Sequence, residues 1–131
     1  DLRTVPSQSW ATVRADLERV VAETCPPEVT AKVHCLVRQR AFQGPSSGPL
    51  MDALSAAHLR VRGEPVGVNI DTAAQCFVTD AVDMAQAGIE TLVYGPAAWH
   101  YEPDEYIEIT EMVDAAKVYL ATAGRLMGLP D

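Results

Sequence analysis

The sequence lacks any apolar run of about 18 residues, the length that a helix needs to cross a bilayer. Its start, Asp1-Leu2-Arg3, also lacks the basic and then apolar pattern of a secretory signal. The three cysteines form neither a C-x-x-C pair nor an even set, which argues against a disulfide framework and favours reduced thiols. We therefore expect a cytoplasmic protein without a membrane-spanning segment.

Basic residues are few relative to acidic ones. Ten lysines and arginines stand against 18 aspartates and glutamates, which gives a formal net charge of -8 and a pI near 4.7. Nucleic-acid binding depends largely on basic side chains that neutralise phosphates, so this balance argues against a nucleic-acid partner. The remaining composition, with 48% hydrophobic residues in a chain of 131, is that of a globular protein.

The first 44 residues are predicted to alternate between strand and helix. Residues 1–4 read as the end of a strand, and Ser7-Gln8-Ser9 can cap a helix. Apolar residues at steps of three and four predict an amphipathic helix from Trp10 to Ala22, and period-two alternation predicts a strand from Thr30 to Val37. Strand, helix and strand make half of a small α/β sandwich, so we expect the other half before residue 1 or in another chain.

A domain boundary is predicted near residue 44, where residues 41–49 combine glycine, proline and serine with almost no periodicity. Residues 45–131 then read as a second α/β unit. Within it, the helix signals and short β-branched runs predict three helices and two strands. The helices are expected from Pro49 to just before Gly63, around Asp80 to Ala87, and from about Thr110 to Met127; the strands are expected at Val66 to Ile70 and Thr91 to Tyr94.

The densest cluster of chemically distinctive residues lies at 94–106, directly after a strand of the buried type. Loops at the carboxyl ends of such strands commonly build the sites of α/β proteins. His100 stands there among carboxylates, and a neighbouring acid can orient an imidazole and raise its basicity. His100 is therefore a candidate metal ligand or general base, with a solvated surface histidine as the alternative.

This cluster resembles the closing motif of the dinuclear zinc amidohydrolases, a family that includes acetylornithine deacetylase, succinyl-diaminopimelate desuccinylase and bacterial glutamate carboxypeptidase. In that family a Gly-Pro turn leads to a zinc-binding histidine, and a series of proline, an acidic residue or asparagine, glutamate and an aromatic or aliphatic residue follows. The chain offers Gly95-Pro96, then His100, then Pro103-Asp104-Glu105-Tyr106.

Two upstream segments resemble the same family in the same order. Thr79-Asp80-Ala81, followed by Gly88-Ile89 and the strand from Thr91, is similar to its Thr-Asp-Ala turn, helix and strand. Asp1-Leu2-Arg3 with Pro6 is similar to a strand of its lid, or dimerisation, domain. The three matches together span essentially the whole chain.

The resemblance implies an α/β fold: the C-terminal half of a ferredoxin-like lid domain in residues 1–44, then the C-terminal part of a zinc-peptidase α/β catalytic domain in residues 45–131. The complete protein is expected to be a metal-dependent hydrolase, a deacylase or carboxypeptidase. It would cleave the amide bond of N-acyl amino acids or short peptides with metal-activated water. Two zinc ions, replaceable by cobalt or manganese, are the implied cofactors, and a homodimer is the expected assembly.

The family's roles carry over to five residues. His100 would bind zinc, and Glu105, or else Asp104, would be the hydrogen-bond partner of its other ring nitrogen; otherwise Glu105 is a loop carboxylate in water. Arg3 would meet a substrate carboxylate, or else lie on a strand surface. Thr79 would line the substrate pocket, or else cap a helix, and Gly95 would also contact substrate.

The chain lacks the rest of the family's metal site. No histidine is followed two positions later by aspartate, and no Glu-Glu pair occurs. We therefore expect no catalytic residue in this chain, no activity of the chain alone, and a missing N-terminal part of the same protein as its partner. The alternative is a non-catalytic α/β interaction or oligomerisation module, or an inactive fragment. His34 and His58 match no motif and are expected on a strand face and a helix face.

Overall fold

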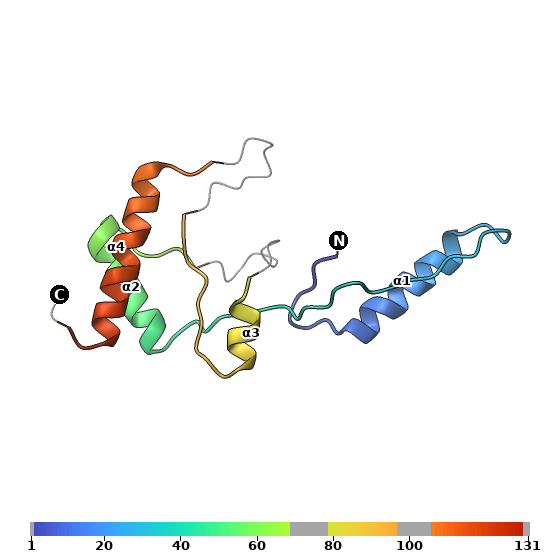
Figure 1. Cartoon of the computed structure of the whole chain (residues 1–131), viewed down its shortest axis with the longest axis horizontal. Coiled ribbons are helices and arrows are strands. Elements are labelled where there is room, and N and C mark those ends of the chain that lie inside the picture. The colour runs from blue at the N-terminus through green and yellow to red at the C-terminus, as the bar shows by residue number, and fades with distance from the viewer. Residues whose placement is uncertain (1, 69–78, 97–105, 130–131) are drawn as a thin grey trace. The chain divides into compact units, whose positions relative to one another are not determined.

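The computed structural model describes residues 2–68, 79–96 and 106–129, and it contains helices in each of these ranges. These helices are α1 (Trp10–Thr24), α2 (Pro49–Arg62), α3 (Ala81–Gln86) and α4 (Ile109–Leu126), as Figure 1 shows. The described residues divide into two compact units: 2–43 form the first, and those from 44 onward form the second. None of the described helices is long and apolar enough to span a membrane.

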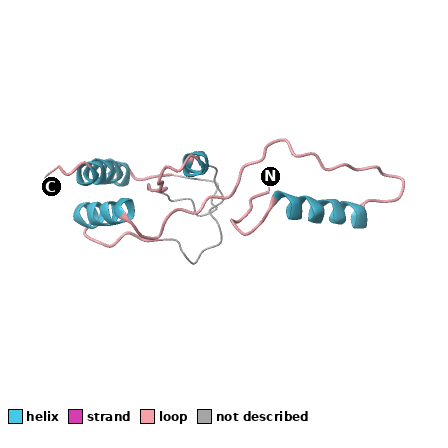
Figure 2. Ribbon diagram, turned by 90° about the horizontal axis from the view of Figure 1, so that it is seen from below, coloured by secondary structure: helices cyan, strands magenta, loops and turns pink. Residues whose placement is uncertain are grey.

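The expected α/β architecture is wrong. Helix accounts for 49% of the described residues and strand for 1%, and no sheet forms among them (Figure 2). The segments from Thr30 to Val37 and from Thr91 to Tyr94 are irregular, as are the described parts of the strands predicted at residues 1–4 and 66–70. A strand is stabilised by hydrogen bonds to a neighbouring strand, and alternation alone supplies no neighbour. The described residues therefore form neither a ferredoxin-like lid nor a zinc-peptidase fold.

The helix α1 begins where the sequence predicts it. The Ser9 hydroxyl accepts a hydrogen bond from the Thr12 amide at 3.2 Å, and the Thr12 hydroxyl accepts one from the Ser9 amide at 3.3 Å. This reciprocal cap satisfies two amide donors at the helix end. The helix stops at Thr24, just before Pro26-Pro27. Only Val13 of α1 is buried, so this helix has little apolar packing within the first unit.

Packing of α2 against α4 forms the core of the second unit. Pro49 starts α2 at a position that needs no amide donor, and Gly63 ends it in the left-handed conformation, with φ of 75°. Leu54 and Ala57 of α2 form a buried cluster with Val118 of α4. Leu92 and Tyr94 pack against this cluster, together with Val61 and Ala121. The segment that precedes the candidate loop is thus held against both helices.

Candidate functional site

The predicted zinc ligand His100 and its predicted partner Glu105 lie in residues 97–105, outside the described residues. Their roles stay predictions. The structure does describe the residues on either side of this loop. Tyr94-Gly95-Pro96 precedes it, and Tyr106 follows it shortly before α4 begins at Ile109.

Tyr94 is held by contacts with both helices of the core. Its hydroxyl lies 2.8 Å from Nδ1 of His58 on α2. Its backbone oxygen accepts a hydrogen bond from the Tyr119 hydroxyl on α4. The Tyr94 ring also stands edge-on to the rings of His58 and Tyr119, with centroid distances of 5.7 Å in both pairs. Side chain and backbone together therefore fix the segment that leads into the loop.

Charged side chains surround this aromatic cluster. The Arg62 guanidinium lies 3.3 Å from Oδ2 of Asp114 and 3.7 Å from Oε1 of Glu111. Lys117 Nζ lies 3.0 Å from the other carboxylate oxygen of Asp114, and this hydrogen bond is the main reason why the pKa of Asp114 is below its ordinary value of 3.8. Burial raises the pKa of Tyr94 above its ordinary value of 10.0, so its hydroxyl is protonated at neutral pH.

A small pocket opens beside these residues. It has a volume of about 200 Å³ and is lined by Arg62, Tyr94, Gly95, Pro96, Glu111 and Ala115. This volume is below the roughly 300–1,000 Å³ of typical small-molecule sites. The positive charge of Arg62 is already paired with Glu111 and Asp114. The pocket therefore offers no unpaired positive charge that could bind an anion. The pocket by itself is therefore a poor ligand site.

Three residues were predicted to bind substrate, namely Arg3, Thr79 and Gly95, and the structure describes the surroundings of each. The Thr79 hydroxyl accepts a hydrogen bond from the Ala81 amide at 3.2 Å, so Thr79 caps the turn into α3. A Cβ added to Gly95 would lie 3.4 Å from the Tyr119 hydroxyl, at van der Waals contact. Arg3 is exposed and belongs to the first unit, whereas Thr79 and Gly95 belong to the second. Contact of these residues with substrate stays a prediction.

The described residues do not supply a metal site by themselves. Within 2–68, 79–96 and 106–129, no three side chains of histidine, cysteine, aspartate or glutamate are grouped so that they could hold an ion. Zinc sites use three or more protein ligands. The ring of His58 is engaged with Tyr94, and His34 lies in the other unit.

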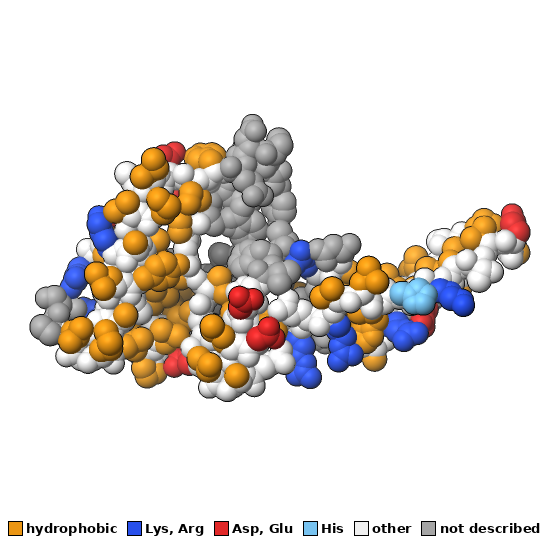
Figure 3. Space-filling model, in the orientation of Figure 1, with side chains coloured by type: hydrophobic (Ala, Val, Ile, Leu, Met, Phe, Trp, Pro, Cys, Tyr) orange, Lys and Arg blue, Asp and Glu red, His pale blue; other side chains and the backbone are white. Residues whose placement is uncertain are grey.

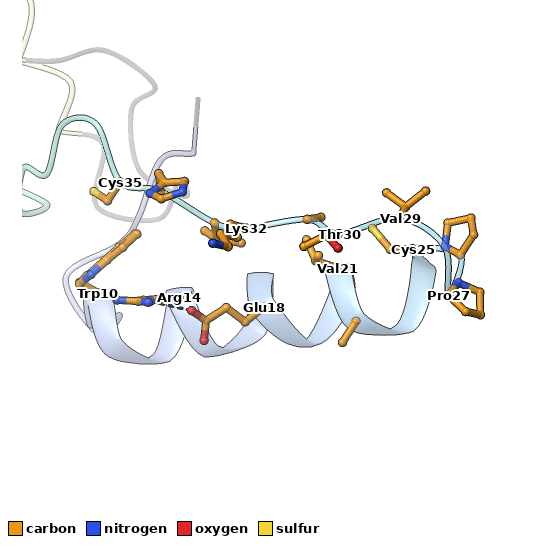
Figure 4. A pocket seen from close by; sticks show the side chains of 15 residues that line it. Trp10, Arg14, Glu18, Val21, Cys25, Pro27, Val29, Thr30, Lys32 and Cys35 are labelled. Carbon is orange, nitrogen blue, oxygen red and sulfur yellow. Dashed lines mark hydrogen bonds and ion pairs between the residues drawn. The ribbon is translucent and has the colours of Figure 1, made fainter.

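A larger groove lies within the first unit, between α1 and residues 25–35 (Figure 4). Its volume is about 880 Å³, and Trp10, the first residue of α1, lines it and is partly exposed. Arg14 and Glu18 pair across one turn of α1, with Nε and Oε1 2.7 Å apart. His34 and Cys35 line the groove, and the Cys35 thiol donates a hydrogen bond to the Val37 backbone oxygen at 3.3 Å rather than to a base.

Sequence reasoning missed the cluster around Tyr94. One local signal was available, because His58 and Arg62 are four positions apart and therefore share a face of α2. Tyr94 gave no such signal, since its partners are 36 and 25 positions away along the chain. In a comparison with models of known protein families, no model matches this chain.

Proposed function

We propose that this chain is the C-terminal part of a dinuclear zinc hydrolase that cleaves the amide bond of N-acyl amino acids or short peptides. The observation that carries the proposal is the series Gly95-Pro96, His100 and Pro103-Asp104-Glu105-Tyr106, preceded in order by the two upstream motifs. The helical fold of the described residues does not add to this support, because it lacks the family's sheet.

The contacts of Tyr94 are the structural support for a functional loop at 97–105. A metal ligand has to be held in position by the residues that flank it and by their own partners. Tyr94 is bonded to His58 through its side chain and to Tyr119 through its backbone. On the other side, α4 begins at Ile109 and packs against α2. The described residues on one side of 97–105 therefore contact α2 and α4, and those on the other side lead into α4.

Within this proposal, His100 contributes one neutral imidazole to the metal centre. The carboxylate of Glu105, or that of Asp104, accepts a hydrogen bond from its other ring nitrogen and fixes the tautomer. The remaining ligands and the glutamate base belong to polypeptide outside this chain, since the chain has no His-x-Asp motif and no Glu-Glu pair. The zinc ions supply an activated water and polarise the substrate carbonyl.

Arg3 is the proposed contact for the carboxylate of the substrate. A guanidinium suits this role because it remains charged and presents a planar set of donors to both carboxylate oxygens. In the complete enzyme, Arg3→Ala should lower kcat/KM more for substrates with a free carboxylate than for those without one. Arg38→Ala is the matched control, because Arg38 is another exposed arginine of the first unit. Equal losses for both substrate types would show that Arg3 has only a structural role.

Zinc content and activity test the main proposal. In the polypeptide that includes the missing ligands, His100→Ala should lower both zinc occupancy and hydrolysis of N-acyl amino acids. His34→Ala, which changes an exposed histidine outside the motifs, should leave both unchanged. The 131-residue chain alone should bind no dinuclear centre after gel filtration. Full occupancy and activity in His100→Ala would contradict the proposal, as would about two zinc ions per isolated chain.

A further inference from the structure

Basic side chains are concentrated in one segment of the first unit. Residues 30–43 contain three of the chain's ten lysines and arginines and none of its 18 acidic residues. These three, Lys32, Arg38 and Arg40, are all exposed, and we call them the basic row. Figure 3 shows lysine and arginine side chains along one side of the first unit. A chain with a formal net charge of -8 therefore carries a local positive surface.

The positive charges of the basic row are not used within the described part of the chain. On α1 of the same unit, Arg14 and Arg19 each form an ion pair with a carboxylate of that helix. No ion pair joins Lys32, Arg38 or Arg40 to a carboxylate within residues 2–68, 79–96 and 106–129. The basic row can thus bind an acidic partner without first breaking an ion pair among these residues.

The backbone of residues 30–43 is also open to a partner. The segment is irregular, with one bend at Leu36, and no backbone hydrogen bond joins it to another of the described segments. Unpaired N–H and C=O groups let an extended peptide bind alongside through its main chain. The side chain of Leu36, between the members of the basic row, is 94% exposed and offers an apolar contact.

The spacing of the basic row fits the carboxylates of an extended peptide. Lys32, Arg38 and Arg40 all stand an even number of positions apart, as does Leu36. Alternate side chains of an extended chain lie on the same side, about 7 Å apart. A peptide with acidic residues at alternate positions therefore repeats the spacing of Arg38 and Arg40, and it reaches Lys32 at the same period.

Other polyanions fit this segment less well. Segments that bind anionic lipid headgroups typically contain about four to eight lysines and arginines, whereas the basic row has three. Nucleic acid presents a long phosphate backbone, and the net charge of the whole chain opposes it. A short acidic peptide depends mainly on the local charge, because exposed charges farther away than about 10 Å are largely screened at ordinary salt concentrations.

We propose that residues 30–43 bind an acidic peptide in extended conformation. The basic row contacts the carboxylates of this peptide, and Leu36 contacts an apolar residue between them. Arg38 and Arg40 each hold one carboxylate with two parallel hydrogen bonds, while Lys32 supplies a point charge. The proposal does not rest on the hydrolase function, and the basic row takes no part in the proposed zinc site.

An NMR titration of the 131-residue chain tests the location of this site. The probe is a short synthetic peptide that alternates glutamate with threonine and has leucine in place of its central glutamate. Its addition should shift the amide signals of residues 30–43 and leave those of α2 and α4 unchanged. Added salt should weaken binding, because it screens exposed charge pairs. A peptide with glutamine in place of every glutamate is the control and should bind much more weakly.

Two double variants test the basic row itself. Arg38→Gln with Arg40→Gln should weaken binding of the glutamate peptide by about ten-fold, because two exposed charge pairs are lost. Arg14→Gln with Arg19→Gln removes the same charge from exposed positions of the same unit and should leave binding nearly unchanged. Circular dichroism checks that both variants keep the helix content of the parent.

Several results would overturn the proposal. Equal losses in the two double variants would show that only the overall charge matters, and equal binding of the glutamine peptide would show that the carboxylates do not. Shifts confined to α2 and α4, or no shifts at all, would exclude residues 30–43 as the site. Tighter binding to phosphatidylserine vesicles or to a DNA oligonucleotide than to the glutamate peptide would assign the segment to a different class of partner.

Discussion

Nδ1 of His58 lies 2.8 Å from the hydroxyl of Tyr94, and this contact joins α2 to the segment that leads into residues 97–105. The two residues are 36 positions apart, so the bond exists only when the second unit is folded. The Tyr94 ring packs against the cluster of Leu54, Ala57 and Val118 at the same time. Core packing and the position of the candidate loop are therefore coupled through one side chain.

Tyr94→Phe removes this hydrogen bond while it keeps the aromatic ring. We expect a loss of about 0.5–1.5 kcal/mol in the free energy of unfolding, measured by urea denaturation. In a double-mutant cycle, His58→Ala should cost less in the Tyr94→Phe background than in the parent, because the shared bond is already lost. Tyr106→Phe, at an exposed tyrosine, is the control. Additive losses for His58 and Tyr94 would contradict the coupling.

The raised pKa of Tyr94 predicts a loss of stability in alkaline solution. Burial favours the neutral phenol, so the folded state has the higher pKa and the unfolded state ionises near 10.0. The contribution of the neutral Tyr94 hydroxyl to stability is fully present below pH 10. It is lost as the pH rises through the pKa of Tyr94 in the folded state. The free energy of unfolding should therefore fall more steeply above pH 10 for the parent than for Tyr94→Phe. Parallel pH curves would contradict the prediction.

The lowered pKa of Asp114 predicts the opposite dependence in acid. The hydrogen bond from Lys117 stabilises the carboxylate, so the unfolded state takes up a proton near 3.8 and the folded state at lower pH. This contribution is present above pH 3.8 and is lost as the pH falls through the folded-state value. Lys117→Met should flatten the acid limb of the stability curve, whereas Lys32→Met should not. An acid limb that is equally steep in Lys117→Met would show that this pair does not matter.

The helices could be predicted from the sequence because their signals are local. Ser9 caps α1, Pro49 starts α2 and Gly63 ends it, and each acts on residues within one turn. The strands could not be predicted in this way. The alternation of Ala31, Val33, Cys35 and Val37 specifies which side chains share a face, but a strand also needs a hydrogen-bonded neighbour. The described residues provide none, so the alternating pattern predicted a strand that does not form and, with it, a wrong fold class.

The candidate site was predictable to a smaller extent. The resemblance of the motif around His100 to a zinc-binding motif predicts its chemical role, and that role stays a prediction. The contacts that hold the start of the loop involve His58, Tyr119 and Arg62, which come from two helices far apart in the sequence. The helix predicted from about Thr110 to Met127 is present as α4, but the sequence does not reveal which side of this helix faces α2.

Leu54 and Leu59 provide a matched test of the α2–α4 core. Leu54 is 6% exposed and lies in the cluster with Ala57 and Val118, whereas Leu59, on the same helix, is 51% exposed. Leu54→Ala should lower the free energy of unfolding by about 2–5 kcal/mol, because it removes buried methyl groups and leaves a cavity. Leu59→Ala should change it by no more than about 0.5 kcal/mol. Both variants replace leucine by alanine in α2, so the difference in helix propensity is the same.

Urea denaturation measures the free energy of unfolding of both leucine variants. Amide hydrogen exchange then follows the segment from Thr91 to Pro96. Because Tyr94 has one partner on α2 and another on α4, loosening of the helix pair by Leu54→Ala should speed exchange in this segment as well. If Leu54→Ala and Leu59→Ala cost the same, or if exchange in this segment stays unchanged, the helix pair does not hold the start of the loop.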